Sequence, residues 1–226
     1  MQLSIIIPNL NDAEYLERLL HFLLTHPVPS SEIIVADGGS QDDSLNIVKQ
    51  MKCQLVETKP SRAIQMNAAV KVARGEFFCF LHADTVPPAS FARDFEYFLS
   101  TSKKAACYRS SYEKGPIMLK LNAFFTRFPW LISRGGDQGL FIQKEYFEQL
   151  GAYSERMEVM EEYPLINRIL KDHELLIIKN NITICTRKYD NRSWLRVSRA
   201  NYVAFKLYQQ GAESSTIKER YLEILS

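Results

Sequence analysis

Short apolar runs and amphipathic segments alternate along the first 88 residues of the chain. The apolar runs have the length of strands and lie at residues 3–7, 32–36, 54–57 and 77–81. The segments between them have helical periodicity and lie at residues 12–24, 42–51 and 62–72. Runs without polar alternation suit strands that are buried on both faces, as in a parallel sheet covered by helices. The pattern therefore predicts an α/β fold with a mostly parallel central sheet flanked by helices.

The pattern is less regular after Pro88. Helices are predicted at residues 91–99, 144–150, 164–171, 193–210 and 215–225. Strands are predicted at residues 105–112, 139–142, 175–178 and 182–186. The last two are separated by Asn180–Asn181, a pair of residues typical of a turn. The segment 116–132 is long, apolar and aromatic, although Lys120 and Arg127 interrupt it.

Composition narrows the class of protein. The 226 residues are enough for one large domain, or for one domain with an appended tail, and 46% of them are hydrophobic, which is ample for a core. A net charge of +2 predicts no preference for nucleic acid. The four cysteines form no CxxC pair, so we expect no structural zinc site.

The sequence contains no sign of export or of a membrane span. The first residues, MQLSIIIP, have neither the charged start nor the long apolar run of a secretory signal. No stretch approaches 18 uninterrupted apolar residues, so no spanning helix is predicted. We therefore expect a cytoplasmic protein.

The first candidate for chemistry is Asp84. It follows the apolar run Phe77–Leu81 in the segment GEFFCFLHADTVPP, where the run changes abruptly to polar residues. Open α/β sheets bind their ligands at the carboxyl ends of the strands, which is where Asp84 would lie. The alternative is a polar loop residue that only ends a core strand.

Two further acidic positions lie at strand ends or in loops. Asp37 ends the second predicted strand, so its carboxylate and that of Asp84 would face one crevice. Such carboxylates can hold a hard divalent cation or bind a ribose. Asp37 could instead be a turn residue before Gly38–Gly39, and the pair Glu161–Glu162 could be acids favoured by the dipole of the helix at Pro164.

The common phosphate-binding glycine patterns are absent. No GxGxxG follows the first strand, and the chain has no GxxxxGK[ST] and no GxSxG. Dinucleotide, P-loop and hydrolase-elbow sites are therefore disfavoured. A nucleotide would have to be held mainly by side chains and a metal.

Five blocks with consistent spacing resemble one known family. They read IIIPNLND, IIVADGGSQD, SRAIQMNAAVKVARGEFFCFLHADT, GGDQGLFIQKEYFEQLGAY and MEEYPLINRIL, and together they cover residues 2–171. In this order they resemble family-two glycosyltransferases with a GT-A fold. The His-Ala-Asp-Thr sequence resembles a bacterial subgroup of that family.

The resemblance implies a transferase that moves a sugar from a nucleotide-diphosphate sugar to a hydroxyl acceptor, with inversion. It implies a catalytic domain at residues 1–190, with a nucleotide-binding half at 1–88 and an acceptor half at 89–190. Residues 191–226 would form a helical extension packed on the same domain. It also implies that a nucleotide-sugar site is formed by Pro8, Leu10, Asn11, Asp12, Asp37, Arg62 and Asp84.

The remaining implied roles concern the metal, the acceptor and the base. Asp84 matches the last acid of the family's D-x-D motif and would bind Mg²⁺ or Mn²⁺. Asp137 and Gln138 would lie on the acceptor and sugar side. Glu161–Glu162 match the Glu-Asp motif that supplies the general base, and Glu162 is favoured over Glu161 for that role.

Two residues depart from the family pattern. His82 stands where many relatives have the first acid of D-x-D, and Glu162 stands where an Asp is usual. These departures keep two alternatives open: a nucleotide-sugar binding protein with weak catalysis, and a sugar-phosphate nucleotidyltransferase. The second would need a glycine-rich basic loop after the first strand, and PNLND is neither.

The last part of the chain is basic and aromatic. Arg187 and Lys188 open a region in which Arg192, Arg199 and Lys206 recur every seven residues, with Arg196 beside them. Its aromatic residues are Trp194, Tyr202, Phe205 and Tyr208. A basic amphipathic helix can lie on an anionic membrane, which would suit a lipid-linked acceptor and a peripheral position on the inner membrane face. The alternative is the solvated face of a helix packed on the core.

Overall fold

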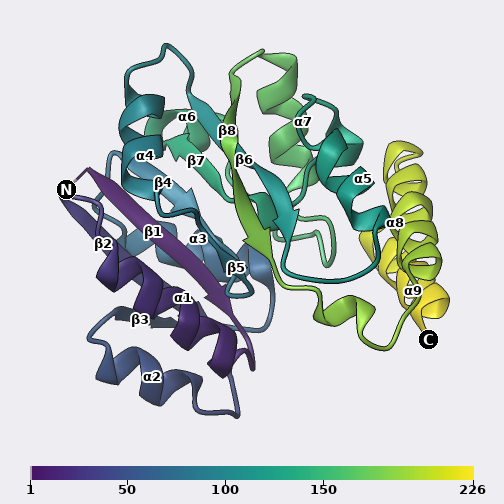
Figure 1. The fold of residues 1–226 in the computed structure, drawn as a ribbon, viewed down its shortest axis with the longest axis horizontal. Coiled ribbons are helices and arrows are strands. Elements are labelled where there is room, and N and C mark those ends of the chain that lie inside the picture. The colour runs from purple at the N-terminus through teal and green to yellow at the C-terminus, as the bar shows by residue number, and fades with distance from the viewer. Residues whose placement is uncertain (1) are drawn as a thin grey trace.

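The computed structural model describes residues 2–226 and contains one mixed sheet (Figure 1). The strands are β1 (Leu3–Asn9), β2 (Ser31–Asp37), β3 (Gln54–Glu57), β4 (Phe77–Phe80), β5 (Thr85–Val86), β6 (Ala105–Tyr112), β7 (Leu140–Gln143) and β8 (Leu175–Ile184). Their order across the sheet is β3-β2-β1-β4-β7-β6-β8-β5. The predicted α/β class and the strand–helix alternation of the first half are confirmed.

The direction of the strands determines which loops meet at one edge. Strands β3, β2, β1 and β4 are parallel to one another, and β7 is antiparallel to both β4 and β6. Strands β6 and β8 are parallel to each other and therefore run in the same direction as β4. The carboxyl ends of β1, β2, β4 and β8 and the amino end of β7 consequently meet at one edge.

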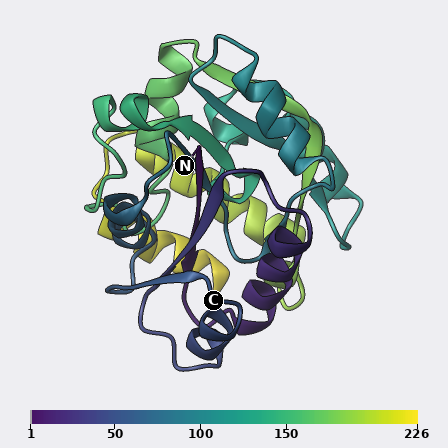
Figure 2. The same ribbon diagram turned by 90° about the vertical axis from the view of Figure 1, so that its left-hand side faces the viewer.

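Helices cover both faces of the sheet because their apolar residues follow helical spacing. The helices are α1 (Ala13–Thr25), α2 (Ser44–Gln50), α3 (Arg62–Val72), α4 (Phe91–Leu99), α5 (Met118–Phe125), α6 (Lys144–Gln149), α7 (Tyr163–Lys171), α8 (Trp194–Gln209) and α9 (Ser214–Leu225). Buried residues of α1, α2 and α4 pack on one face, and those of α3, α6 and α7 pack on the other. Figure 2 shows the purple α1 and the blue α3 on opposite sides of the sheet.

The predicted turn at Asn180–Asn181 is wrong, because residues 175–184 form one strand. The register against β6 pairs Tyr108 with Ile178 and the next residue, Arg109, with Asn181. Lys179 and Asn180 therefore form a bulge inside a continuous strand. The Asn180 amide donates to Asp94 Oδ1 at 2.7 Å and to Ser90 Oγ at 3.0 Å, so α4 satisfies the polar side chain that suggested a turn.

The N-terminus of α1 is stabilised by a residue from another loop. Asp12 occupies the N-cap position, but its side chain makes no capping bond. Asp42, from the loop after β2, accepts the Ala13 backbone N–H at 2.9 Å and the Ser44 N–H at 3.1 Å. One carboxylate thus stabilises the first turns of both α1 and α2, and the Asp12 side chain is left for another partner.

The C-terminal helices α8 and α9 form a pair beside α7. The Tyr163 ring contacts the Phe205 and Tyr208 rings at 5.9 and 5.5 Å between centroids. Lys218 on α9 pairs with Glu158 at 2.7 Å. Among the helices described, none combines the length and the apolar character that a membrane crossing requires.

Candidate active site

The polar residues predicted from the sequence gather at the edge where β1, β2, β4 and β8 end. Asn9 and Asp37 are the last residues of β1 and β2 and are paired in the register. Asp84 follows β4, and the loop 134–139 leads into the amino end of β7. The topology therefore brings residues from four distant parts of the sequence to one crevice.

Asp37 is held by four hydrogen bonds from its own chain. Its Oδ1 accepts the N–H groups of Gly39 and Ser40 at 2.9 and 2.7 Å. Its Oδ2 accepts Asn9 Nδ2 at 2.8 Å and Ser40 Oγ at 2.6 Å. Only 1% of the residue is exposed. This is the geometry of a turn residue, so a nucleoside could bind the Asp37 carboxylate only by replacing one of these bonds.

The loop after β1 carries the other residues predicted for the base and the ribose. Pro8 is buried, whereas Leu10 is 41% exposed and Asn11 is exposed. Asn11 has a φ of 53°, and its side chain accepts the Gln41 N–H at 2.7 Å. The loop is therefore tied to the loop after β2 while Leu10 remains open to solvent.

Asp12 and Asp84 are joined by a residue that was not among the predicted site residues. The Arg187 guanidinium donates to both carboxylate oxygens of Asp12, with the second bond at 3.0 Å, and lies 3.4 Å from Asp84 Oδ2. It also lies over the Tyr15 ring, 4.7 Å from the centroid. The side-chain hydrogen bond from Asp12 is the main reason that the pKa of Arg187 is raised.

Arg187 and Lys188 belong to the crevice and not to a basic stripe on a C-terminal helix. They lie in a single helical turn, Arg187–Tyr189, that directly follows β8. Lys188 is partly buried. Burial lowers its pKa, but attraction to Asp137, and to a lesser extent to Asp84, more than offsets this and leaves the pKa raised. Both residues follow the carboxyl end of a strand, a position that assigns them to the site once the direction of that strand in the sheet is known.

The expected basic and aromatic face of the C-terminal helix is present only in part, since Arg196, Arg199, Lys206 and Tyr202 are exposed on α8. Arg192 precedes α8, and its Nε donates to the Leu225 carbonyl at 3.1 Å, so it is not part of a helical stripe. Phe205 is buried and, with Tyr208, contacts Tyr163 instead of forming an exposed aromatic surface.

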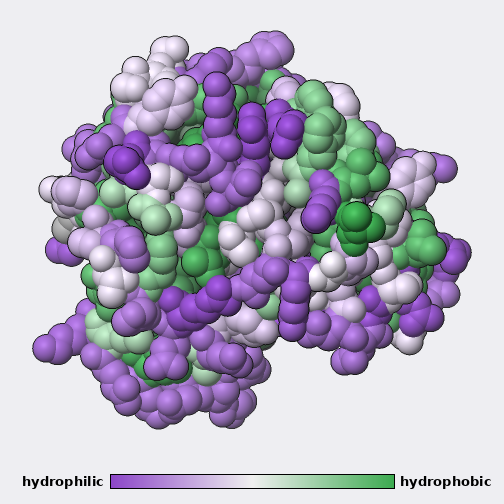
Figure 3. Space-filling model, viewed as in Figure 1, coloured by the Kyte–Doolittle hydropathy of each residue, from purple (hydrophilic) through white to green (hydrophobic). Residues whose placement is uncertain are grey.

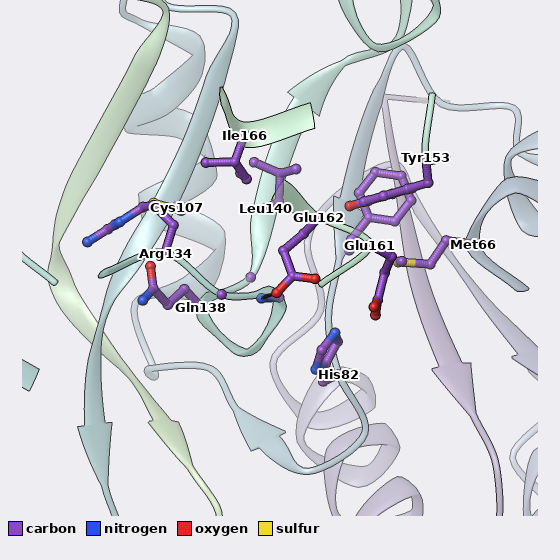
Figure 4. Close-up of a pocket in the computed structure, with 14 residues that line it drawn as sticks. Met66, His82, Cys107, Arg134, Gln138, Leu140, Tyr153, Glu161, Glu162 and Ile166 are labelled. Carbon is purple, nitrogen blue, oxygen red and sulfur yellow. Dashed lines mark hydrogen bonds between the residues drawn. The ribbon is translucent and has the colours of Figure 1, made fainter. Parts of the chain in front are cut away.

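A small pocket next to the crevice contains both predicted catalytic acids. Figure 4 shows Glu161, Glu162 and His82 pointing toward one another. The acids come from the loop before α7, and His82 comes from the end of β4. Apolar side chains, among them Met66, Phe80, Leu140 and Ile166, line much of the rest of the pocket, together with the polar Arg134 and Gln138. The surroundings are therefore poorly solvated and favour the neutral form of a carboxyl group.

The Glu162 carboxylate is positioned by the loop across the pocket. The Gly136 backbone N–H donates to Glu162 Oε1 at 3.0 Å. Burial, followed by repulsion from Glu161, raises the pKa of Glu162 to about 7, although the Gly136 bond opposes the rise. A carboxylate with this pKa can accept a proton near neutral pH, as a general base requires.

Glu161 is more buried than Glu162, with 4% of the residue exposed. Its Oε1 lies 3.8 Å from a guanidinium nitrogen of Arg62, the first residue of α3. Within the part of the chain that the structure describes, this oxygen has no hydrogen-bond partner. Arg62 is 57% exposed at its side chain and keeps N–H donors free for an anion.

The same nearby charges shift the pKa values of His82 and Asp137. The pKa of His82 lies well below its usual value because of burial and the nearby Arg62 and Lys188, so the imidazole is neutral. Burial raises the pKa of Asp137, and Asp84 adds to the rise while Lys188 opposes it. Asp84, Asp137, Arg62 and Lys188 therefore share one electrostatic environment.

A buried arginine fixes the loop that carries Gly136. Arg134 is 3% exposed and donates to the Thr126 carbonyl and, at 3.1 Å, to Cys107 Sγ. The Gln138 amide donates to the Ser133 carbonyl at 2.7 Å. Gln138 is thus partly a loop-positioning residue, whereas the sequence suggested contact with the sugar or acceptor.

A divalent cation at this edge would rest on Asp84. Among residues 2–226, no three His, Cys, Asp or Glu side chains gather closely enough to hold a metal by themselves. Mg²⁺ commonly uses one or two carboxylates and takes its other ligands from water and substrate phosphates. The partly exposed Asp84 carboxylate fits that mode, and its one ion-pair partner in the described residues is Arg187.

The family assignment rests on sequence comparison. Residues 4–139, more than half of the chain, match the family described as Glycosyl transferase family 2. The chain belongs to this family. An uncharacterized glycosyltransferase of Nostoc is 32% identical over 106 residues, which cover 43% of the chain and 33% of that protein. The chain spans about a third of the length of such curated relatives.

Solved structures of other glycosyltransferases have the same fold. The Staphylococcus aureus poly(ribitol-phosphate) β-N-acetylglucosaminyltransferase TarS is 23% identical over 92% of this family-2 chain and 35% of the full-length protein. Its structure with UDP-GlcNAc superposes with a TM-score of 0.68 at 17% identity and covers the whole chain and 72% of the solved one. A Pyrobaculum calidifontis mannosyltransferase with GDP-Man and Mn²⁺ gives 0.67 at 18% identity, over 97% of this chain and 68% of that one. The expected GT-A fold is confirmed.

Proposed function

We propose that this family-2 chain transfers a sugar from a nucleotide-diphosphate sugar to a hydroxyl acceptor, with inversion at the anomeric carbon. The observation that carries the proposal is the Glu162 carboxylate. It has a pKa of about 7, accepts the Gly136 N–H and lies in a poorly solvated pocket beside the crevice of Asp84 and Arg62. The relatives with bound UDP-GlcNAc and GDP-Man support a donor of this chemical class.

The donor would lie across the carboxyl ends of β1, β2 and β4. The loop of Pro8, Leu10, Asn11 and Asp12 would hold the base and ribose, together with Asp37 if one of its bonds is exchanged. Arg62 and Lys188 would face the diphosphate, because both cations lie near Asp137 and Lys188 also lies near Asp84. A guanidinium can bind phosphate oxygens in a fork, which fixes the orientation of the leaving group.

The reaction would be one displacement. The acceptor oxygen forms the new bond to the anomeric carbon while the bond from that carbon to the diphosphate oxygen breaks. Glu162 takes the proton of the acceptor hydroxyl, and the electron pair of the broken bond goes to the diphosphate. The charge that develops there is stabilised by Arg62 and Lys188. Asp137 would lie on the acceptor side, where its carboxyl group could bind a hydroxyl group of the acceptor or the sugar.

Glu162 is a better candidate for the base than Glu161. Glu161 lies beside Arg62, which stabilises its carboxylate, whereas the surroundings of Glu162 favour uptake of a proton. Asp84 would hold Mg²⁺ or Mn²⁺, which as a Lewis acid would add to the stabilisation of the leaving diphosphate. Relatives with bound Mn²⁺ support this assignment.

An assay for release of nucleoside diphosphate distinguishes a transferase from a protein that only binds the nucleotide sugar. Nucleotide sugars with different bases are incubated with the protein, and free diphosphate is measured with and without Mn²⁺. Slow release from one donor is expected, because water can replace the acceptor in an assembled site. Tight binding of a donor without release, also in the presence of candidate acceptors, would favour the binding protein. Release of pyrophosphate from a nucleoside triphosphate and a sugar phosphate would favour the nucleotidyltransferase.

We also propose contact with an anionic membrane, which would suit a lipid-linked acceptor and a peripheral position on the cytoplasmic side. The surface that supports it is α5 and the turn after it, and Figure 3 shows hydrophobic side chains over α5. Large apolar side chains are exposed there: Ile117, Met118, Leu121, Phe124, Phe125, Trp130 and Ile132. Arg127 lies over the Phe124 ring at 4.5 Å and supplies positive charge. Aromatic residues with nearby cations suit the interface of a bilayer.

Vesicle sedimentation tests this surface. Binding to vesicles with phosphatidylserine is expected to exceed binding to neutral vesicles and to fall in a Phe124→Ser, Trp130→Ser variant. Equal recovery in the supernatant with and without anionic vesicles would contradict membrane contact and leave the transfer chemistry unaffected.

A further inference from the structure

The backbone places Arg187 next to Asp84. Strand β5 pairs with β8 so that Thr85 faces Ile184, and the Cys185 N–H donates to the Asp84 carbonyl at 3.0 Å. Arg187 therefore lies two residues after Cys185, whose backbone bond fixes it to the segment that carries Asp84. Its position beside that carboxylate follows from the sheet and does not depend on a long flexible loop.

The Arg187 side chain connects three parts of the crevice. It bonds both oxygens of Asp12 in the loop after β1, lies over Tyr15 on α1, and reaches Asp84 after β4. One guanidinium thus lies between two carboxylates, where a divalent cation would neutralise the same charges. The contact with Asp84, at 3.4 Å, uses one nitrogen only, so Asp84 is the partner more easily released.

A metal and Arg187 compete for Asp84, because the positive charge of each repels the other at the same carboxylate. The side chains of Arg187 and Asp84 are 38% and 23% exposed, so their pairing is partly screened by water and is worth little. A diphosphate offers Arg187 several charged oxygens and a two-pronged geometry that one Asp84 oxygen does not provide. The arrival of a donor therefore changes which partner Arg187 prefers.

We propose that Arg187 is a placeholder for the divalent cation. In the protein without donor its guanidinium bridges Asp84 and Asp12, and it leaves Asp84 when it binds the donor diphosphate. This inference rests on the proposed function. It makes the binding of metal and nucleotide cooperative, because each ligand removes an obstacle to the other.

The test measures Mn²⁺ binding without nucleotide, from the loss of the free-ion signal in electron paramagnetic resonance. Arg187→Gln is expected to bind Mn²⁺ roughly three- to five-fold more tightly than the wild type, since a weak competing ion pair is gone. The same variant is expected to bind the nucleoside diphosphate roughly ten-fold less tightly, since charge-assisted bonds to phosphate are lost. If Arg187 had only a structural role, Arg187→Gln would bind both Mn²⁺ and the nucleoside diphosphate less tightly.

Two further variants are measured beside Arg187→Gln. Arg93→Gln, an exposed arginine on α4, removes the same charge far from the crevice and is expected to leave both affinities unchanged. Arg187→Lys keeps the charge without the fork and is expected to fall between the wild type and Arg187→Gln for both ligands. A far-ultraviolet spectrum and a melting curve show whether each variant is folded.

Unchanged or weaker Mn²⁺ binding by folded Arg187→Gln, while the wild type binds nucleotide and Mn²⁺, would overturn the placeholder and leave the transferase function intact. Wild-type protein that is folded but binds no nucleotide at all would overturn the transferase proposal, and the placeholder with it. Opposite changes in the two affinities would support the inference.

Discussion

Asp37 and Glu162 are carboxylates that the fold treats in opposite ways. The four bonds to Asp37 use all of its usual acceptor positions, and the residue is almost completely buried. Glu162 accepts one backbone N–H from the facing loop, beside a second acid and apolar side chains. The Asp37 carboxylate stabilises a pair of loops, whereas burial and the neighbouring Glu161 raise the pKa of the Glu162 carboxylate.

The contrast extends to the two sides of the crevice. On the side of β1 and β2, Gln65 donates to the Asn9 and Ala36 carbonyls at 2.6 and 2.8 Å, so the ends of these strands are fixed before any ligand arrives. On the side of the loop before α7, Glu161 Oε1 has no hydrogen-bond partner within residues 2–226, and the neighbouring Glu162 has a raised pKa. Polar groups that are already satisfied form a scaffold, whereas a buried unpaired oxygen and a shifted pKa indicate where chemistry takes place.

The largest expected effect is on turnover. Glu162→Gln removes the proposed base and is expected to lower kcat by about 10²- to 10⁴-fold, the usual contribution of general base catalysis. Donor affinity should change by less than about two-fold, since the reacting proton belongs to the acceptor. Steady-state assays of sugar transfer measure the first, and calorimetry measures the second.

Glu148→Gln is the matched control, because Glu148 is exposed on α6. Its turnover should equal that of the wild type. Turnover of Glu162→Gln close to that of the wild type would remove Glu162 from the role of base and direct attention to Glu161.

The proposed role of Asp37 in stabilising the two loops is tested by measuring the free energy of unfolding. Asp37→Ala leaves the buried donors of Asn9 and Ser40, and the more exposed Gly39 N–H, without an acceptor, and is expected to lower the free energy of unfolding by about 3 kcal/mol. Urea unfolding measures the change, with the exposed Asp190→Ala as control. A loss of donor affinity without a loss of stability would instead identify Asp37 as a ligand-binding residue.

The loop that positions Glu162 has little room for a side chain. A Cβ at Gly136 would lie 2.5 Å from His82 Nε2, so Gly136→Ala forces the loop and the imidazole apart. We expect destabilisation of about 1–3 kcal/mol and a fall in kcat/KM as the bond to Glu162 is displaced. The double variant Gly136→Ala, His82→Ala should recover much of the stability. Equal stability losses in both variants would show that His82 is not the obstacle.

A further expected effect is on the pH dependence of stability. The pKa of Glu162 is about 7 in the folded chain and near 4.5 in the unfolded one, so between these values the folded state binds more protons. The free energy of unfolding should therefore fall as the pH rises from 4.5 to 7. Glu162→Gln lacks this loss, so its melting temperature relative to the wild type should increase over the same range. A difference that is constant with pH would contradict the raised pKa.

Much of the fold follows from local sequence patterns. The helices at 62–72 and 91–99 and the strand at 105–112 have the predicted bounds, because each has a clear periodicity and a recognisable end. The strand at 175–184 was divided wrongly at Asn180, since its side chain is satisfied by Asp94 and Ser90, more than 80 residues away. Local patterns contain no information on such bonds.

The site shows the same limit. Asp84 was named from its place after a strand, and Arg62 and Glu162 were named from the family resemblance. The structure places Glu162 in the pocket next to the crevice of Asp84. Arg187 and Lys188 were assigned to a basic surface, because the sequence shows their charge but not the direction of β8. Once β8 runs parallel to β6 and thus in the direction of β4, its carboxyl end reaches Asp84. The missing information was the topology of the sheet.

A thermal-shift screen tests the central claim most directly. The folded protein is melted with UDP, GDP, CDP and dTDP, each with and without Mn²⁺, beside an Asp84→Asn variant. A ligand at about 100 times its Kd adds about 2.7 kcal/mol of stability. The account predicts that one nucleotide raises the melting temperature, that Mn²⁺ enlarges the shift, and that Asp84→Asn loses the enlargement. No shift with any nucleotide would contradict a nucleotide-sugar site in this chain.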